Sequence, residues 1–182
     1  MSTAVYVPIG AEGFEFCHPV DEGNFETLNV QIDGTQRGQT WTPLQMRLVR
    51  EDEGKPLMES DSPWLGSHAL IFRKRALDRV GAFLEEHGEL LPVGCPDADL
   101  AIFNPRVVDA FDEATSSVLR FSNGRIMRIM KHVFRADVVA QTSAFKIPNL
   151  RVSPTFVGER FVELWNSAGL KGLDFKKVWS SS

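Results

Sequence analysis

A regularly spaced apolar stripe near the middle of the chain limits most strongly how the chain can fold. Leu77, Val80, Phe83 and Leu84 recur at i, i+3, i+6 and i+7, which places them on one face of an α-helix. A glycine follows directly and is a typical helix stop. The stripe therefore predicts an amphipathic helix at about 73–87 with one buried face.

A second helix is predicted at about 158–168. Phe161, Leu164 and Trp165 share a helical face there, and Gly169 follows as a stop signal. The next apolar segment, 173–179, is typical of a strand that closes a sheet.

The Asn123-Gly124 pair is the strongest hairpin signal in the chain. Apolar arms at 117–121 and 125–134 flank it. The second arm also fits a helical stripe with basic residues opposite, so periodicity alone favours a helix. The turn and the β-branched content favour a strand, and we expect a strand.

Shorter apolar runs predict further strands. They lie at 69–72 (as a buried strand or the entry to the first helix), 89–93, 100–103 and 145–147. Helices and strands are mixed without a regular β-α-β alternation. The pattern therefore predicts the α+β class, with a mostly antiparallel sheet and two main helices.

The N-terminal region is rich in turn-forming residues. Leu28, Val30 and Ile32 alternate as a half-buried strand would, and the Asp-Gly pair at 33–34 is a hairpin signal. A second short strand, broken by a proline, is expected at 41–49.

A polar stretch at 50–63 separates this region from the rest of the chain. The N-terminal piece is too small to bury a core of its own. We therefore expect residues 1–60 to form a β-rich segment that packs on a main domain at 61–182.

Composition and termini predict a cytoplasmic protein. The net charge is −4, and no run of 18 apolar residues suggests a membrane span. The first ten residues lack Lys, Arg and a long apolar run, so no secretory signal is expected. The two cysteines, Cys17 and Cys95, cannot form a disulfide scaffold. The acidic balance argues against direct nucleic-acid binding.

The sequence contains none of the common catalytic or metal-binding motifs: no His-Glu-x-x-His, Cys-x-x-Cys, Gly-x-Ser-x-Gly or phosphate loop. Asp97 and Asp99 would share a face on a strand and could reach one cation. Gly94 and Pro96 precede them, and a turn is the favoured reading. We expect no cofactor and no metal. A metal-dependent hydrolase that uses Asp97, Asp99 and His68 is the enzymatic alternative.

Charge is distributed unevenly along the chain. Residues 85–113 carry eight acids and one base, a charge of −7, whereas residues 114–160 carry eight bases and two acids, a charge of +6. The two segments could neutralise each other. Alternatively, the acidic segment could meet a basic protein partner, since complementary charge speeds and selects association. The predicted binding residues are Glu85, Glu86, Glu89, Asp97, Asp99, Asp109, Asp112 and Glu113.

A basic stripe at Arg125, Arg128 and Lys131 lies close in sequence to Phe121 and Phe134. Such a stripe could indicate nucleic-acid binding. We expect these aromatic residues to face the core, and no RNA-binding motif accompanies them.

A series of short motifs between Asp61 and Trp179 carries a family resemblance. In chain order they are Asp61-Ser62-Pro63, Ala69-Leu70-Ile71-Phe72, Gly88-Glu89-Leu90-Leu91-Pro92, Phe103-Asn104, Val107-Val108-Asp109-Ala110, Phe121-Ser122-Asn123-Gly124-Arg125-Ile126, Phe145-Lys146-Ile147-Pro148, Ser153-Pro154-Thr155-Phe156-Val157 and Gly169-Leu170-Lys171-Gly172-Leu173-Asp174-Phe175. Together they resemble an immunity protein family of bacterial polymorphic toxin systems, typified by a Myxococcus immunity protein. The chain departs from this pattern at Arg73-Lys74, where a small polar helix cap is usual, which leaves the helix start open.

The resemblance implies a non-enzymatic protein that is made beside a toxin gene and binds the toxin. Such toxins pass between competing bacteria, often by contact-dependent or type VI secretion machinery. The resemblance supplies no catalytic residue. The expected partner is a cognate protein toxin encoded next door, which the eight acidic residues would contact. A homo-oligomer and an adaptor role in a secretion system stay open.

Overall fold

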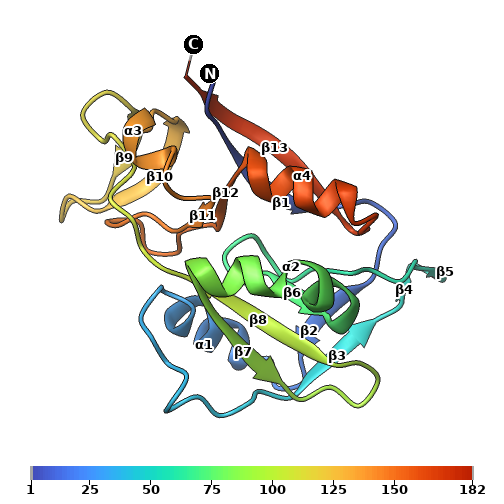
Figure 1. Cartoon of the computed structure of the whole chain (residues 1–182). Coiled ribbons are helices and arrows are strands. Elements are labelled where there is room, and N and C mark those ends of the chain that lie inside the picture. Colours follow the sequence, from blue (N-terminus) through green and yellow to red (C-terminus); the bar gives the residue numbers. More distant parts are fainter. Residues whose placement is uncertain (1, 182) are drawn as a thin grey trace.

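Two antiparallel sheets and the helices that pack on them organise residues 2–181, the part of the chain that the computed structural model describes (Figure 1). The larger sheet has the strand order β11-β12-β1-β13. Its strands are β11 (Ala144–Phe145), β12 (Phe156–Gly158), β1 (Ala4–Gly10) and β13 (Leu173–Ser180). The N-terminal strand therefore lies between strands from the C-terminal part, and the two chain ends lie side by side (Figure 1).

The smaller sheet places β8 (Leu100–Pro105) between β6 (Ile71–Arg73) and β7 (Gly88–Val93), antiparallel to both. All six residues of β8 are buried. Because successive side chains point to opposite faces of a strand, Phe103 packs into one core cluster and Ile102 into another. The predicted strands at 89–93 and 100–103 are confirmed.

The two predicted helices are confirmed as α2 (Lys74–His87) and α4 (Glu159–Ser167). They bury their apolar faces together in one cluster between the two sheets. The rings of Phe83 and Phe161 lie 5.7 Å apart, and those of Phe72 and Trp165 lie 6.0 Å apart. No helix within residues 2–181 is long and apolar enough to cross a membrane.

Helix α2 begins without a side-chain cap, because its N-cap residue is Arg73, whose guanidinium has no acceptor for the free N–H groups of the first turn. The Arg73 guanidinium pairs with the buried Glu15 carboxylate and with Glu59, and it donates to the backbone oxygen of Ser60. A buried carboxylate needs such a partner. The ion pair ties the N-terminal region to the start of α2.

The strand predicted at Leu28–Ile32 is wrong, because this segment forms α1 (Asn24–Gln31). Leu28 and Ile32 are buried against the second face of the smaller sheet, whereas Val30 is 58% exposed. The two buried residues are therefore spaced i, i+4, which is the spacing of one face of a helix.

The Asp33-Gly34 pair does not turn a hairpin. Gly34 has a φ of 88°, and its N–H donates to Asn104 Oδ1 at 2.8 Å. A side chain at this position would also collide with Val107 and the Pro105 oxygen. Glycine is required here by a left-handed backbone that approaches β8 closely.

The second N-terminal strand begins later than expected. Strand β3 (Met46–Val49) pairs with β2 (Phe16–Pro19), which sequence reasoning did not identify. Within the polar stretch at 50–63, β4 (Glu51–Asp52) and β5 (Lys55–Pro56) form a small hairpin.

The Asn123-Gly124 hairpin is confirmed as β9 (Ser117–Arg120) and β10 (Ile126–Lys131), so the second arm is a strand, as expected. Its inner face packs with the short helix α3 (Ala136–Val139) in a third cluster, on the larger sheet. In Figure 1 the hairpin stands at the side of the molecule, apart from α2 and α4.

Lys146 is a fully buried cation that holds three separate segments. Its Nζ donates to the backbone oxygens of Ile32, His68 and Ser153 at 2.5 to 3.1 Å. Three acceptors match the three protons of an ammonium group. Burial lowers the pKa of Lys146 to about 7, and Asp33 opposes this shift.

Candidate functional site

The acidic residues predicted to bind a partner differ in how far they are engaged within the protein. Several of them pair with the basic segment that follows in sequence. The pairs are Arg160 with Glu86 at 3.8 Å, Arg135 with Asp109 at 2.9 Å and Arg120 with Glu113 at 3.1 Å. The two segments therefore neutralise each other in part, which was the alternative left open by the charge count.

Glu89 is an internal anchor. Its Oε2 accepts the N–H of Arg37 at 2.8 Å, and its Oε1 accepts the N–H of Gly38 at 2.9 Å. The side-chain amide of Asn104 donates to the same carboxylate at 3.4 Å. Glu89 thus fixes the loop after α1 against β7 and β8.

Asp97 and Asp112 both lie in turns. Asp97 follows β7 in an exposed turn, as the favoured reading predicted. Asp112 accepts the backbone N–H of Thr115 at 3.3 Å. The pKa of Asp112 is lowered, chiefly by its bond to the Thr115 side chain.

Glu85, Asp97 and Asp99 are the exposed acids of this set that take part in no ion pair within residues 2–181. The backbone oxygen of Asp99 accepts the N–H of Lys74 at the start of α2. Glu85 lies eleven residues further along α2, about 16 Å away at the rise of about 1.5 Å per residue. These free acids therefore stand at opposite ends of α2.

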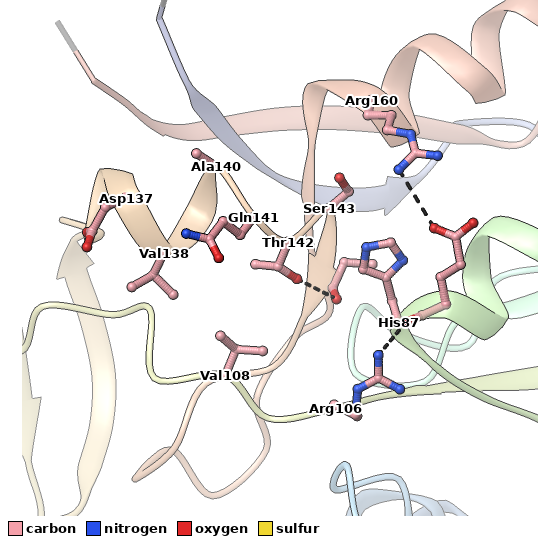
Figure 2. A pocket seen from close by; sticks show the side chains of 12 residues that line it. His87, Arg106, Val108, Asp137, Val138, Ala140, Gln141, Thr142, Ser143 and Arg160 are labelled. Carbon is pink, nitrogen blue, oxygen red and sulfur yellow. Dashed lines mark hydrogen bonds and ion pairs between the residues drawn. The ribbon is translucent and has the colours of Figure 1, made fainter.

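A polar pocket of about 650 Å³ lies between the end of α2, the chain after β8 and the α3–β11 segment (Figure 2). Arg106 donates to the backbone oxygen of Glu86, and Thr142 Oγ1 donates to the Ala144 oxygen at 3.4 Å. The polar groups on this wall therefore largely bind the pocket's own backbone.

The pocket does not assemble a nucleophile and a base. Its histidine, His87, bonds through Nδ1 to the Phe83 oxygen at 2.9 Å, and their rings lie 4.7 Å apart. Figure 2 shows Asp137 and His87 on opposite sides of the pocket. In the part of the chain described, no hydrogen bond joins His87 to a hydroxyl or carboxylate, so His87 is not arranged as the base of a nucleophile–base pair.

The alternative hydrolase set is not assembled either. Within residues 2–181, no group of three or more His, Cys, Asp or Glu side chains could hold a metal ion, so Asp97, Asp99 and His68 form no such group. Burial lowers the pKa of His68 to about 4, and Lys146 contributes to the shift. His68 is thus neutral near pH 7, beside the buried lysine.

The outer face of the β9–β10 hairpin carries exposed apolar side chains that sequence reasoning missed. Leu119, Phe121, Met127 and Met130 are 42% to 58% exposed. Phe134 is buried as expected, but Phe121 is not. The bulges at Met127 and Met130 interrupt the pairing of β10 with β9, and alternation along a regular strand does not reveal them.

One family model matches part of the chain. It is the Imm11 model, described as "Immunity protein family", and it matches residues 105–180. The match spans 76 of the 182 residues and includes the hairpin, α3, α4 and β13. It confirms the resemblance to an immunity protein family; the motifs before residue 105 lie outside it. No curated protein matches the chain.

Proposed function

We propose that this chain is an immunity protein that binds a cognate antibacterial toxin and neutralises it by occlusion. The observation that carries the proposal is the Imm11 family match at residues 105–180. The protein would act in the cytoplasm of the producing cell and protect it against toxin delivered between competing bacteria. The toxin would be the product of a neighbouring gene.

Occlusion requires a rigid surface of suitable charge and shape, and it requires no catalytic group. The absence of a nucleophile–base pair around His87, within the described residues, is compatible with such a role. Rigidity is supported by the way buried groups such as Lys146 and Glu15 join distant segments. A non-enzymatic inhibitor is therefore the function that these features favour.

Only some of the eight acidic residues remain candidates for contact with the toxin. Glu85, Asp97 and Asp99 are exposed and available to a basic toxin, whereas Glu89 is occupied by backbone donors. A nuclease toxin, for example, would carry a basic surface for phosphate. Charge complementarity would then favour contact with the free acids.

The test is co-expression of this chain with the product of the adjacent toxin gene. We expect a stable complex in a pull-down and restored growth of the toxin-expressing cells. The variant Phe72→Asp is the matched control, because Phe72 is fully buried in the cluster between the sheets and a charge there should unfold the protein. It should lose both complex and rescue.

Absence of both complex and rescue with a toxic neighbour would contradict the proposal. Rescue without any complex would point to an enzyme that modifies or degrades the toxin. Metal analysis of the purified protein would then be the next measurement.

A further inference from the structure

A second hollow, of about 440 Å³, lies between the hairpin and the edge of the larger sheet. Residues 128–132, from β10 and the position after it, form one wall, and residues 176–178 of β13 form the other. We call this hollow the β10–β13 groove. Both walls belong to the segment that the Imm11 family model matches.

The charged side chains that line the groove, among the described residues, are all basic. Four bases line it, Arg128, Lys131, Lys176 and Lys177, and the lining contains no Asp or Glu. None of the four takes part in an ion pair within residues 2–181, although ten ion pairs are formed elsewhere in that part of the chain. No carboxylate therefore pairs with these four charges in the described residues, although the Lys177 ammonium lies over the Tyr6 ring, 5.7 Å from its centre.

Apolar side chains accompany these bases. Leu119 pairs across the hairpin with Arg128, so both side chains lie on the outer face, opposite Val118 and Ile129, which pack on the core. Met130 stands at a bulge in the groove wall and is 58% exposed. Exposed methionine adapts its shape to a partner, and exposed apolar residues beside charge are typical of protein contacts.

Both walls also have free strand edges. β13 is the outermost strand of its sheet, and β10 pairs only with β9 in its sheet. Within the described residues, no further backbone hydrogen bond is made by residues 127–131 of β10 or 174–180 of β13. An extended segment could use such edges as additional backbone partners.

We propose that the β10–β13 groove binds an acidic, extended segment of the cognate toxin. Carboxylates of that segment pair with the four bases, and its apolar residues contact Leu119 and Met130. This inference rests on the proposed function and names the surface through which it is performed.

The observations favour a protein segment over a nucleic acid. Single-stranded nucleic acid binds where several aromatic side chains stack on bases. Along the hairpin the exposed apolar residues include one aromatic, Phe121, and are otherwise Leu119, Met127 and Met130. Aliphatic and methionine contacts suit a polypeptide.

The experiment compares two triple charge reversals in binding to the purified product of the adjacent toxin gene. The groove variant is Arg128→Glu, Lys176→Glu and Lys177→Glu. The control is Arg47→Glu, Lys55→Glu and Arg79→Glu, which changes the same charge at exposed positions with no ion pair within the described residues. Circular dichroism checks that both variants fold.

We expect the groove variant to raise Kd about tenfold or more at 0.15 M salt, because three charge pairs with the toxin segment are replaced by like-charge repulsion. The control variant should bind as the wild type does.

Carbodiimide coupling tests the acidic character of the partner segment. The reagent activates a carboxylate as its O-acylisourea; a lysine amine in contact with it then attacks the acyl carbon, so that an amide forms and the carbodiimide leaves as its urea. We expect amide links from Lys131, Lys176 or Lys177 to toxin Asp or Glu residues in the complex. Lys→Arg variants at these positions should keep the affinity and lose the links.

Failure of the proposed function and failure of this inference give different results. If the wild type forms no complex with the toxin, the proposed function fails and the inference fails with it. If the wild type binds and the groove variant binds equally well, the inference alone is overturned. The same holds if the groove variant loses affinity only for a 30-nucleotide oligonucleotide probe and not for the toxin.

Discussion

The buried Lys146 allows the sharpest test of how this fold is held together. Lys146→Met removes the ammonium and keeps a flexible apolar chain of similar length in its place. The backbone oxygens of Ile32, His68 and Ser153 then lose a donor that no other described group supplies. The three segments that meet there should separate more easily.

The magnitude follows from two opposing contributions. Three hydrogen bonds from a charged donor contribute roughly 1.5 to 3 kcal/mol each, while burying the ammonium costs several kcal/mol, which methionine avoids. We expect a net loss of about 2 to 4 kcal/mol in the free energy of unfolding. For a chain of this length that lowers Tm by about 2 to 4 °C per kcal/mol.

The assay is urea unfolding at pH 6, below the pKa of about 7, where Lys146 is charged. Lys55→Met is the matched control, since Lys55 is exposed on β5 and its replacement should change stability by less than about 0.5 kcal/mol. A Lys146→Met variant as stable as the wild type would refute the reasoning.

The pH dependence adds a second check. The lysine has a pKa of 10.5 when unfolded and about 7 when folded, so between these values the unfolded state binds more protons. Wild-type stability relative to Lys146→Met should therefore rise with pH, by about 1.4 kcal/mol per unit, in that window. A constant difference between pH 7 and pH 9 would show that burial does not shift this group.

The remaining predictions concern three other buried or half-buried groups. The folded-state pKa of His68 is lowered from 6.5 to about 4, so the unfolded state binds more protons between these values. Stability should therefore fall as pH drops through this window, by about 2 to 3 kcal/mol at pH 4.5. In urea unfolding, His68→Gln should remove that pH dependence. Burial raises the pKa of Cys17 to about 12, so a thiol reagent at pH 8 should label only the half-buried Cys95 in the native protein and both cysteines after denaturation; rapid native labelling of both would contradict this. Glu89→Ala should lower the stability by about 1 to 3 kcal/mol, whereas Asp97→Ala in its exposed turn should not, and equal Tm values for the two variants would argue against the anchoring role of Glu89.

The elements with strong local signals were predictable. Helices α2 and α4 have full apolar faces and end at or near glycines, and the Asn123-Gly124 pair decided between strand and helix for β10. In each case the local preference and the tertiary packing agree.

The segment 28–32 was predicted wrongly because its apolar residues fit both the alternation of a strand and the i, i+4 spacing of a helix. Val30 made 28–32 look like an alternating strand, but only Leu28 and Ile32 are buried. Gly34 was assigned to a hairpin, although its backbone is fixed by Asn104, 70 residues away in sequence. Long-range contacts of this kind leave no local signature.

The site was predicted only in part. The opposite charges of the two segments were evident from counting, but counting cannot tell which acids are taken up by internal pairs such as Arg135 with Asp109. The bulges at Met127 and Met130 lie in the β9–β10 pairing, and β10 lines one groove with β13, which is nearly 50 residues further along the chain; neither feature is visible in the sequence pattern.

Binding to the cognate toxin is the central claim, and titration tests it most directly. The purified protein would be titrated calorimetrically with the product of the adjacent toxin gene, and the growth of toxin-expressing cells would be followed in parallel. We predict saturable binding in the nanomolar range together with loss of toxicity. Absence of binding, with the toxin still lethal to cells that make this protein, would contradict the account.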